Sequence, residues 1–394
     1  MICKEISFSN FRNIEEERVS FSDGINVLWG KNAQGKSNVL EAVYYFARGR
    51  SFRGAHDRDM IKFGSDFARI SSKCYRGNSE YPTELEVVID ASDAVKKRVF
   101  RNGAAASGMG EIIGSFRAVL FCPANLSLVS GPPAGRRAFL DIAISQLSKE
   151  YMSCLADYKR VLQQRNAALR AAAKGDVMPR ELWETYASQM SYAASRISSY
   201  RLDYLSMLSS KMNVIFNDMT HGSETPSLSY VSHSFKKDGG YDDEDGLERG
   251  EVEAAGASSF GDAKIDADCL VEHLTSNIDR EIKNGATLWG PHKDDIRIKL
   301  NGRDAKTFAS QGQLRSLALS MKLSEGEISN VITGDAPVML LDDVLSELDR
   351  DRRDFVLGAI VGRQIIVTSC EPSLFDSAGA ADLLKVEAGR ITRM

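Results

Sequence analysis

The sequence predicts an α/β fold whose main domain is assembled from the two ends of the chain, with a helical-hairpin arm domain inserted between them. Three observations predict this arrangement. A compact apolar run, Gly24–Gly30, precedes a glycine-containing loop and a helix near the N-terminus. A second apolar run, Val338–Leu341, ends in paired acids near the C-terminus, and the region between the two runs carries apolar residues at helical spacing.

Short strands are expected in the N-terminal third. Apolar and polar residues alternate over residues 1–8, and the apolar run Gly24–Gly30 predicts a buried strand followed by a helix, Ser37–Arg48. Further strands are expected within segments 17–21, 84–90, 97–103 and 116–121. We therefore expect this third to form one lobe, built on a mixed sheet with one helix.

Helical periodicity begins at Arg136. One apolar stripe runs from Leu140 to Leu162 and a second from Trp183 to Leu208, with a break at residues 175–179. This pattern predicts a helical hairpin, each arm of which would reach roughly 50 Å at about 1.5 Å per residue. A projecting arm and a packed helical subdomain are both compatible with it.

The charge is uneven along the chain. Fifty Lys and Arg against 54 Asp and Glu give a net charge of -4, which excludes a histone-like basic protein. Residues 236–268 hold eleven acids and four bases, a net of -7, so the remainder carries +3. Because so acidic and glycine-rich a run cannot bury much apolar surface, we expect a mobile surface insertion there.

Cellular location is predicted from two absences in the sequence. The chain contains no uncharged apolar run of about 18 residues, and its six cysteines include no C-x-x-C pair. We therefore expect a cytoplasmic protein with reduced thiols and no association with membranes.

The C-terminal third is expected to be α/β with parallel strands. A strand pair is predicted within residues 287–303, a helix over 310–328, and buried strands at 338–341 and 364–369. The expected domains are residues 1–135, the arm domain 136–285 with its acidic insertion 236–268, and the C-terminal segment 286–394.

Residues Gly30–Ser37 fit the pattern G-x-x-x-x-G-K-[ST] and lie between an apolar strand and a helix, where a phosphate loop must lie. Its backbone N–H groups and the positive end of the helix can cradle phosphate oxygens, Lys36 can reach the β- and γ-phosphates, and Ser37 can ligate Mg²⁺. The pattern predicts binding of ATP with Mg²⁺. The expected nucleotide-binding residues of the loop are Gly30, Lys31, Asn32, Ala33, Gln34, Gly35, Lys36 and Ser37.

A phosphate loop needs an acid to hold its Mg²⁺, and Asp342, at the end of the apolar run, is the candidate. Asp343 would then face the water that attacks the γ-phosphate. The expected catalytic residues are Lys36, Asp342 and Asp343. The 306 residues that separate Lys36 from Asp342 favour an ATPase head assembled from both chain ends.

Two weaker motifs lie in the right order around the paired acids. Ser310-Gln311-Gly312-Gln313 precedes a helix and is similar to the ABC-type signature, which would bind a γ-phosphate through Ser310, Gly312 and Gln313. Ser346–Asp349 follows the acids as the D-loop does. Alternatively, the first is a polar turn and the second a helix start capped by Ser346.

Seven segments occur in a recognisable order over nearly the whole chain. They are FSNFRN, GKNAQGKSN, RSFR, PANLSLVSGPPAGRRAFLD, WGPHKDD, FASQGQLRS and LLDDVLSELDRDRRDFVL. The chain resembles the RecF family, ABC-type ATPases of bacterial recombinational gap repair. The resemblance implies an ABC-type ATPase head and an ATP-dependent homodimer in which Ser310, Gly312 and Gln313 act in trans. It also implies nucleotide contacts from Asn13 and Asp349, and slow, DNA-dependent ATP hydrolysis that serves mainly as a dimerisation switch.

The resemblance further implies the partners. Single-stranded and gapped duplex DNA would be bound without sequence specificity, RecR and RecO would bind the protein, and RecA would be loaded indirectly. Local basic clusters must supply the DNA contacts, since the net charge opposes them. The candidates are Arg48, Arg50, Arg53 and Arg58, then Lys96, Lys97, Arg98 and Arg101, and finally Arg136 and Arg137.

Three alternatives remain open. An SMC/Rad50-type chromosome-maintenance ATPase shares the head, although the short arms and the missing C-x-x-C hook argue against it. A transporter subunit would have a continuous head. An ATP-binding switch that never hydrolyses ATP is also compatible, because Asp343 stands where related ATPases often have Glu.

Overall fold

In the computed structural model the chain forms two compact units. Unit 1 combines Met1–Ser127 with Ala318–Met394, and unit 2 is the intervening stretch Leu128–Leu317. The structure describes residues 1–77, 79–91, 96–232, 241–242, 248–254, 267–371 and 381–394. No helix within these ranges is both long and apolar enough to cross a bilayer.

The first sheet of unit 1 is antiparallel and uses only N-terminal residues. Its strand order is β2-β1-β4-β5-β6-β7. Along β4 buried and more exposed side chains alternate, as they do in a sheet with one face on the core. The strands are β1 (Ile2–Phe11), β2 (Ile14–Ser20), β4 (Phe67–Tyr75), β5 (Thr83–Asp90), β6 (Lys96–Arg101) and β7 (Ala104–Ala106).

The second sheet of unit 1 joins the two ends of the chain, in the order β17-β16-β3-β15-β14-β8. Strand β3 pairs in parallel with β15 and β16, and β8 pairs in parallel with β14. Every residue of β14 and β15 is buried, which is typical of parallel strands covered on both faces. The strands are β3 (Ile25–Trp29), β8 (Ala118–Phe121), β14 (Val338–Leu341), β15 (Ile365–Ser369), β16 (Asp382–Glu387) and β17 (Arg390–Arg393).

The expectation of a single mixed sheet in the N-terminal third is therefore wrong. The apolar runs of β3 and β8 need strand partners that the N-terminal residues do not supply, and they find them in β14, β15 and β16. The predicted helix is confirmed as α1 (Lys36–Arg48), which ends at Gly49 in the left-handed conformation, where the Gly49 N–H bonds the Tyr45 carbonyl.

The remaining helical segments of unit 1 are short, apart from one that crosses its boundary. Helix α9 (Gln311–Thr333) begins in unit 2 and enters unit 1 at Ala318. The others are η1 (Asp57–Met60), α2 (Met109–Ile112), η2 (Pro123–Ser127), η3 (Val344–Glu347) and α10 (Arg350–Ala359).

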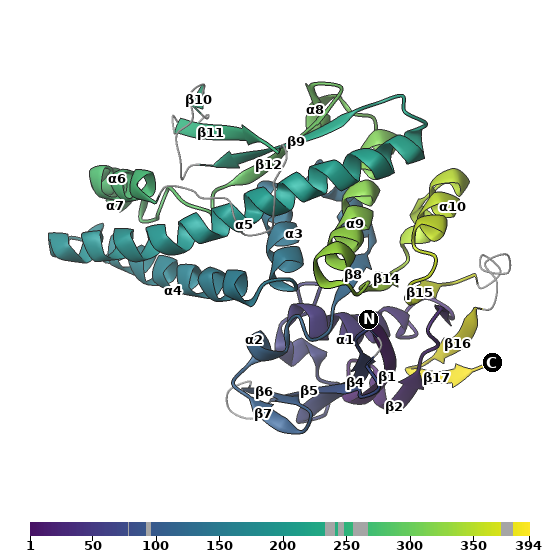
Figure 1. Ribbon diagram of the computed structural model, residues 1–394. Coiled ribbons are helices and arrows are strands. Elements are labelled where there is room, and N and C mark those ends of the chain that lie inside the picture. Colours follow the sequence, from purple (N-terminus) through teal and green to yellow (C-terminus); the bar gives the residue numbers. More distant parts are fainter. Residues whose placement is uncertain (78, 92–95, 233–240, 243–247, 255–266, 372–380) are drawn as a thin grey trace. The chain divides into compact units, whose positions relative to one another are not determined.

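Unit 2 is built on helices α3 (Pro133–Ser145), α4 (Lys149–Ala172) and α5 (Arg180–Thr220), and α4 packs along α5 (Figure 1). The predicted break is confirmed, since no helix covers residues 175–179. At about 1.5 Å per residue, α5 is about 61 Å long and α4 about 36 Å. The expectation of one continuous first helix is wrong, because Ser148 accepts a hydrogen bond from the Tyr151 N–H at 3.1 Å and starts α4 anew.

The sheet of unit 2 has the order β10-β11-β9-β12-β13. Strand β12 pairs with β9, so residues 286–317, which the sequence assigned to the C-terminal segment, lie in unit 2. The strands are β9 (Pro226–Ser232), β10 (Tyr241–Asp242), β11 (Glu248–Glu253), β12 (Asp295–Leu300) and β13 (Arg303–Asp304). The short helices are α6 (Asp268–Ser276), α7 (Ile278–Asn284) and α8 (Ala305–Phe308).

The acidic segment 236–268 is only partly described. Its parts 236–240, 243–247 and 255–266 lie outside the described residues, whereas β11 pairs with β9. Glu251 accepts a hydrogen bond from the Ser229 hydroxyl at 2.6 Å and forms ion pairs with Arg297 and Lys299. The expectation of a mobile insertion is therefore wrong for β11, which pairs with β9 and whose acidic charge is offset by basic neighbours.

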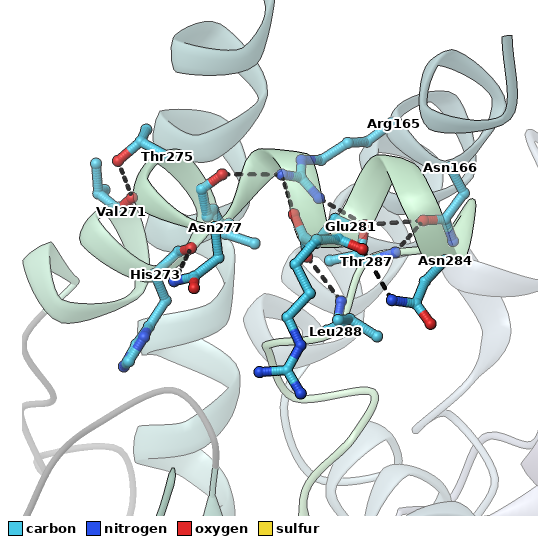
Figure 2. Close-up of polar contacts among 12 residues, drawn as sticks. Arg165, Asn166, Val271, His273, Thr275, Asn277, Glu281, Asn284, Thr287 and Leu288 are labelled. Carbon is cyan, nitrogen blue, oxygen red and sulfur yellow. Dashed lines mark hydrogen bonds and ion pairs between the residues drawn. The ribbon is translucent and has the colours of Figure 1, made fainter. Parts of the chain in front are cut away.

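A buried ion pair anchors α4 to α6 and α7 (Figure 2). The Arg165 guanidinium donates to Glu281 Oε2 at 2.5 Å, to Thr287 Oγ1 at 2.9 Å and to the Leu274 carbonyl at 3.1 Å. The other Glu281 oxygen accepts from the Leu288 N–H at 2.7 Å. Both charged side chains are 0 % exposed, so the free-energy cost of burying their charges is offset only by this set of partners.

Candidate nucleotide-binding site

The phosphate loop Gly30–Ser37 lies between β3 and α1, at the carboxyl end of the parallel strands. Its path depends on two glycines. Gly35 has φ +113°, and a Cβ there would lie 2.7 Å from Asn13 Oδ1. A Cβ on Gly30 would lie 2.3 Å from the Val386 carbonyl oxygen. Larger residues at these positions would displace the loop from its supports.

The loop is held from both sides by distant parts of the chain. The Asn13 amide donates to the Gln34 carbonyl at 3.0 Å and accepts from the Asn38 amide at 2.8 Å. The turn between β16 and β17 adds two bonds, from the Gly389 N–H to the Gln34 carbonyl at 2.9 Å and from the Ala388 N–H to Gln34 Oε1 at 2.7 Å. Asn13, which the family resemblance implies as a nucleotide contact, here holds the loop backbone through its side chain.

Lys36 lies inside the loop and is 4 % exposed. Its ammonium donates to the Gly30 carbonyl at 2.6 Å and to the Lys31 carbonyl at 3.1 Å, and it lies 3.3 Å from Cys370 Sγ. These carbonyls hold the ammonium beside the first N–H groups of α1, where an anion would gain from both the charge and the helix dipole.

The paired acids follow β14, as predicted. Asp342 is buried, and the Ser37 side chain is near enough to lower its pKa, so the two expected Mg²⁺ ligands are neighbours. Burial raises the pKa of Asp342, and the nearby Ser37 side chain opposes that rise. The structure thus joins a residue after β3 to one after β14.

Thr368, at the end of β15, ties the two acids to each other. Its hydroxyl lies 3.1 Å from Asp342 Oδ1 and 3.2 Å from Asp343 Oδ1, and it accepts from the Asp343 N–H at 2.9 Å. Asp343 has φ +49°, the left-handed conformation, and is more exposed than Asp342. Sequence analysis missed Thr368, since only the parallel pairing of β14 with β15 brings it here.

The FSNFRN and RSFR segments meet at α1. Arg12 forms two parallel bonds to the Glu41 carboxylate, at 2.9 and 2.7 Å, and Ser51 donates to the same carboxylate. Arg53 donates to Asn38 Oδ1 at 2.9 Å, and its charge lowers the pKa of Asp342 against the larger effect of burial. One basic residue proposed for DNA therefore lies beside the phosphate loop.

The signature residues Ser310, Gly312 and Gln313 belong to unit 2. The Gln313 N–H donates to the Ser310 hydroxyl at 3.3 Å, and the Ser310 N–H donates to Gln313 Oε1 at 2.6 Å. This reciprocal capping box starts α9. Gln313 also donates to Glu224.

In the D-loop the helix cap is not where the alternative interpretation expected it. Asp349, not Ser346, caps α10 and accepts from the Arg352 N–H at 3.0 Å. Ser346 lies in η3 and donates to the Asp343 carbonyl at 2.7 Å. Ser346 therefore closes the turn that carries the paired acids.

Several of the basic DNA candidates are already engaged. Arg136 is buried and forms two bonds to Asp295, at 2.7 and 2.8 Å, so it is removed from the set. Arg137 donates to the Asp294 carbonyl at 2.8 Å. Lys97 pairs with Asp57 at 2.8 Å. Burial lowers the pKa of the Arg48 guanidinium. The exposed candidates are Arg50, Arg53, Arg58, Lys96, Arg98 and Arg101.

The fold and the phosphate-loop site are those of a nucleotide-binding domain. The sequence model of the RecF/RecN/SMC N terminal domain matches residues 2–392. The chain therefore carries an ABC/SMC-type ATPase domain. The DNA replication and repair protein RecF of Geobacillus sp. (strain WCH70) is 33 % identical over 395 residues, covering 100 % of this chain and 99 % of that protein. The chain belongs to the RecF family of DNA replication and repair proteins.

Solved structures agree with this assignment. The recombination mediator protein RecF-ATP in the RecFOR pathway superposes with a TM-score of 0.85 at 30 % identity, covering 100 % of this chain and 97 % of that one. The Smc head domain of Pyrococcus furiosus superposes with a TM-score of 0.54 at 14 % identity, covering 100 % and 96 %, and shares the fold alone. The resemblance to the RecF family is confirmed, and this chain has the mixed α/β fold of RecF and the SMC head.

Proposed function

We propose that this recombination mediator binds ATP in the phosphate loop and uses the nucleotide to close a homodimer on DNA. The observation that carries the proposal is the phosphate loop itself, in which the Gly30 and Lys31 carbonyls hold the Lys36 ammonium beside the start of α1. The relative solved under the name RecF-ATP, at 30 % identity over the full chain, supports the choice of nucleotide.

ATP would bind through backbone and charge together. The N–H groups of the loop and of the first turn of α1 would donate to phosphate oxygens, and the positive end of the helix favours the same anion. Lys36 would exchange the Gly30 and Lys31 carbonyls for the β- and γ-phosphates. The supports from Asn13 and Gly389 keep the loop backbone in place while the ammonium changes partners.

Ser37 and Asp342 fit a Mg²⁺ ion. Both side chains offer oxygen atoms, the ligand type that this cation prefers, and Ser37 is near enough to Asp342 to lower its pKa. When bound, Mg²⁺ would neutralise charge on the β- and γ-phosphates. A cation there would also lower the pKa of Asp342, against the rise that burial causes.

Hydrolysis would depend on Asp343. Its carboxylate would orient or deprotonate a water that attacks the γ-phosphorus, while the bond from phosphorus to the bridging oxygen breaks and ADP and inorganic phosphate form. Thr368 fixes the Asp343 backbone and contacts its carboxylate. Aspartate is one methylene shorter than glutamate, so weak hydrolysis is expected. The resemblance to the RecF family is the ground for proposing that hydrolysis depends on DNA and that the nucleotide acts mainly as a dimerisation switch.

The dimer would be isologous, with two nucleotides shared between protomers. Ser310, Gly312 and Gln313 of one protomer would meet the γ-phosphate held by its partner, and Asp349 would contribute from the D-loop. The capping box supports this role because it fixes the start of α9 and leaves further N–H groups of the first turn for an anion.

DNA would be held through its backbone by the exposed basic residues of unit 1, without sequence readout. Single-stranded and gapped duplex DNA are the proposed ligands. The RecF-ATP relative is a recombination mediator protein of the RecFOR pathway, which supports RecO and RecR as partners here. A cytoplasmic location and an indirect role in loading RecA are part of the same proposal.

ATP-dependent sizing tests the proposal. Light scattering with ATP and a gapped duplex should show a dimer that retains DNA, while Lys36→Met should remain monomeric with ATP. Lys73→Met, an exposed change on β4, is the matched control and should behave as the unaltered protein does. A chain that stays monomeric with ATP, and retains gapped DNA no better with it, would refute the proposal.

A further inference from the structure

A hollow of about 530 Å³ lies beside the paired acids of unit 1. Hydroxyl, thiol, amide and charged side chains line it, with a single leucine. The lining residues are Asn32, Asp343, Leu345, Ser346, Arg353, Thr368, Ser369, Cys370 and Glu371. The hollow thus mixes polar and apolar surface, borders the candidate nucleotide site, and is lined in part by Arg353, which has no counterpart among the predicted site residues.

Arg353 differs from its neighbours on α10. Arg350 pairs with Asp354 at 3.6 Å, and Arg352 pairs with Asp349. The Arg353 guanidinium forms no ion pair with any residue that the structure describes. Its backbone N–H bonds the Asp349 carbonyl at 3.0 Å, so the start of the helix fixes where this side chain leaves the backbone.

Another part of the lining leads to the phosphate loop. Cys370 lines the hollow, and its sulfur lies 3.3 Å from Lys36 Nζ and 3.0 Å from Asn32 Oδ1. The hollow is thus lined by Cys370, which lies beside the Lys36 ammonium, and by Arg353. Thr368, Ser369 and Ser346 also line it.

The charges of the lining decide what this hollow can hold. Asp343 and Glu371 would repel an anion, and Arg353 is the cation among the lining residues that the structure describes. A phosphate anion could stay there only through a guanidinium, whose fork of N–H donors matches phosphate oxygens. Arg353 pairs with no carboxylate in the described part of the chain, so its guanidinium can bind an anion. The two acids that also line the hollow would keep that binding weak.

We propose that the hollow is a binding site for inorganic phosphate, the product of hydrolysis, and that Arg353 is the residue that holds it. The inference rests on the proposed function, because it assumes that a γ-phosphate is cleaved at the phosphate loop. The phosphate would pass from Lys36 to Arg353 along the wall formed by Cys370 and the hydroxyl groups, and the adjacent Asp343 would then repel it outward.

Titration calorimetry with inorganic phosphate tests the inference on the full-length protein saturated with ADP and Mg²⁺. Arg353→Ala should weaken phosphate binding about tenfold, the loss of one charge-assisted contact at a partly exposed site. Arg353→Lys should recover part of that loss, because it restores the charge without the fork. Arg350→Ala, in the same turn of α10 but 85 % exposed, is the matched control and should change nothing.

Steady-state kinetics supply a readout that a merely structural role of Arg353 would not produce. In Arg353→Ala the inhibition constant for phosphate should rise by the same factor, while the KM for ATP and the affinity for ADP stay within about twofold, since no nucleotide contact is lost. Equal phosphate binding by Arg353→Ala and the unaltered protein would overturn the inference, as would an absence of phosphate binding in the unaltered protein.

The same experiments separate this inference from the proposed function. If Lys36→Met binds ADP as tightly as the unaltered protein does, the nucleotide site is wrong and the inference fails with it. If Lys36→Met loses ADP while Arg353→Ala keeps its phosphate affinity, only the phosphate site is wrong.

Discussion

Replacing Arg165 by methionine should sharply destabilise unit 2. The substitution keeps most of the side-chain volume but leaves the Glu281 carboxylate buried and unpaired, since both side chains are 0 % exposed. Breaking a buried ion pair from one side costs about 3–5 kcal/mol. For a unit the size of Leu128–Leu317, at about 2–4 °C per kcal/mol, the expected fall in Tm is about 6–20 °C.

The cost should depend on pH in a defined direction. Burial raises the pKa of Glu281 above its ordinary value of 4.5, and Arg165 opposes that rise. Without Arg165 the folded-state pKa climbs further, so the unfolded carboxyl ionises at a pH where the folded one is still protonated. The penalty is therefore smallest below about pH 4.5 and grows as the pH rises toward the folded-state pKa.

Scanning calorimetry of the full chain at several pH values measures both effects. Adding Glu281→Leu to Arg165→Met should recover most of the loss, because a buried pair can be replaced by apolar residues at little cost. Arg180→Met, which breaks an exposed pair with Glu184 on α5, is the control and should cost less than about 1 kcal/mol. If Arg165→Met lowers Tm no more than Arg180→Met does, the buried pair does not anchor α4.

Three further predictions concern the nucleotide site. Ser310→Arg should leave ATP affinity within about twofold yet prevent the ATP-dependent dimer, because a guanidinium would fill the position that we assign to the partner's γ-phosphate. Light scattering measures the dimer, and normal dimerisation would refute the trans assignment. Gly389→Val should weaken ATP binding about tenfold or more, since a Cβ there would lie 2.4 Å from the Asn13 carbonyl oxygen and disturb the support of Gln34. Equilibrium binding measures the ATP affinity, and an unchanged affinity would show that the turn between β16 and β17 is dispensable for binding. Asp343→Asn should reduce the rate of phosphate release about 100-fold or more with ATP affinity retained, as expected for loss of a general base. A phosphate-release assay that shows no slowing would refute a catalytic role for Asp343.

The centre of the candidate site could be predicted from the sequence because its signals are local. Gly30–Ser37 and the acids after Val338 are short patterns tied to a strand end, and the structure brings Ser37 near Asp342. Thr368, Cys370 and Arg353 carry no such pattern. They reach the site through parallel strand pairing and the turn into α10, which depend on contacts between residues far apart in the sequence.

Two missed elements have equally specific causes. The break between α3 and α4 contains neither glycine nor proline, so only the cap formed by Ser148 marks it. Strand β11 was hidden by its acidic composition, and Arg297 and Lys299 on β12 compensate for that composition only once the sheet has formed. Sequence patterns report local periodicity, whereas both of these features depend on a partner.

The shared sheet of unit 1 has a consequence for synthesis on the ribosome. Strand β3 pairs with β15 and β16, which are translated more than 300 residues later. At 5–20 residues per second, β3 waits roughly 20–70 s for its neighbours, with apolar edges and faces open to aggregation. A nonsense codon that removes only β16 and β17 would leave every recognisable motif in the chain intact, and would still leave β3 with one edge bare and Gln34 without the turn that supports it.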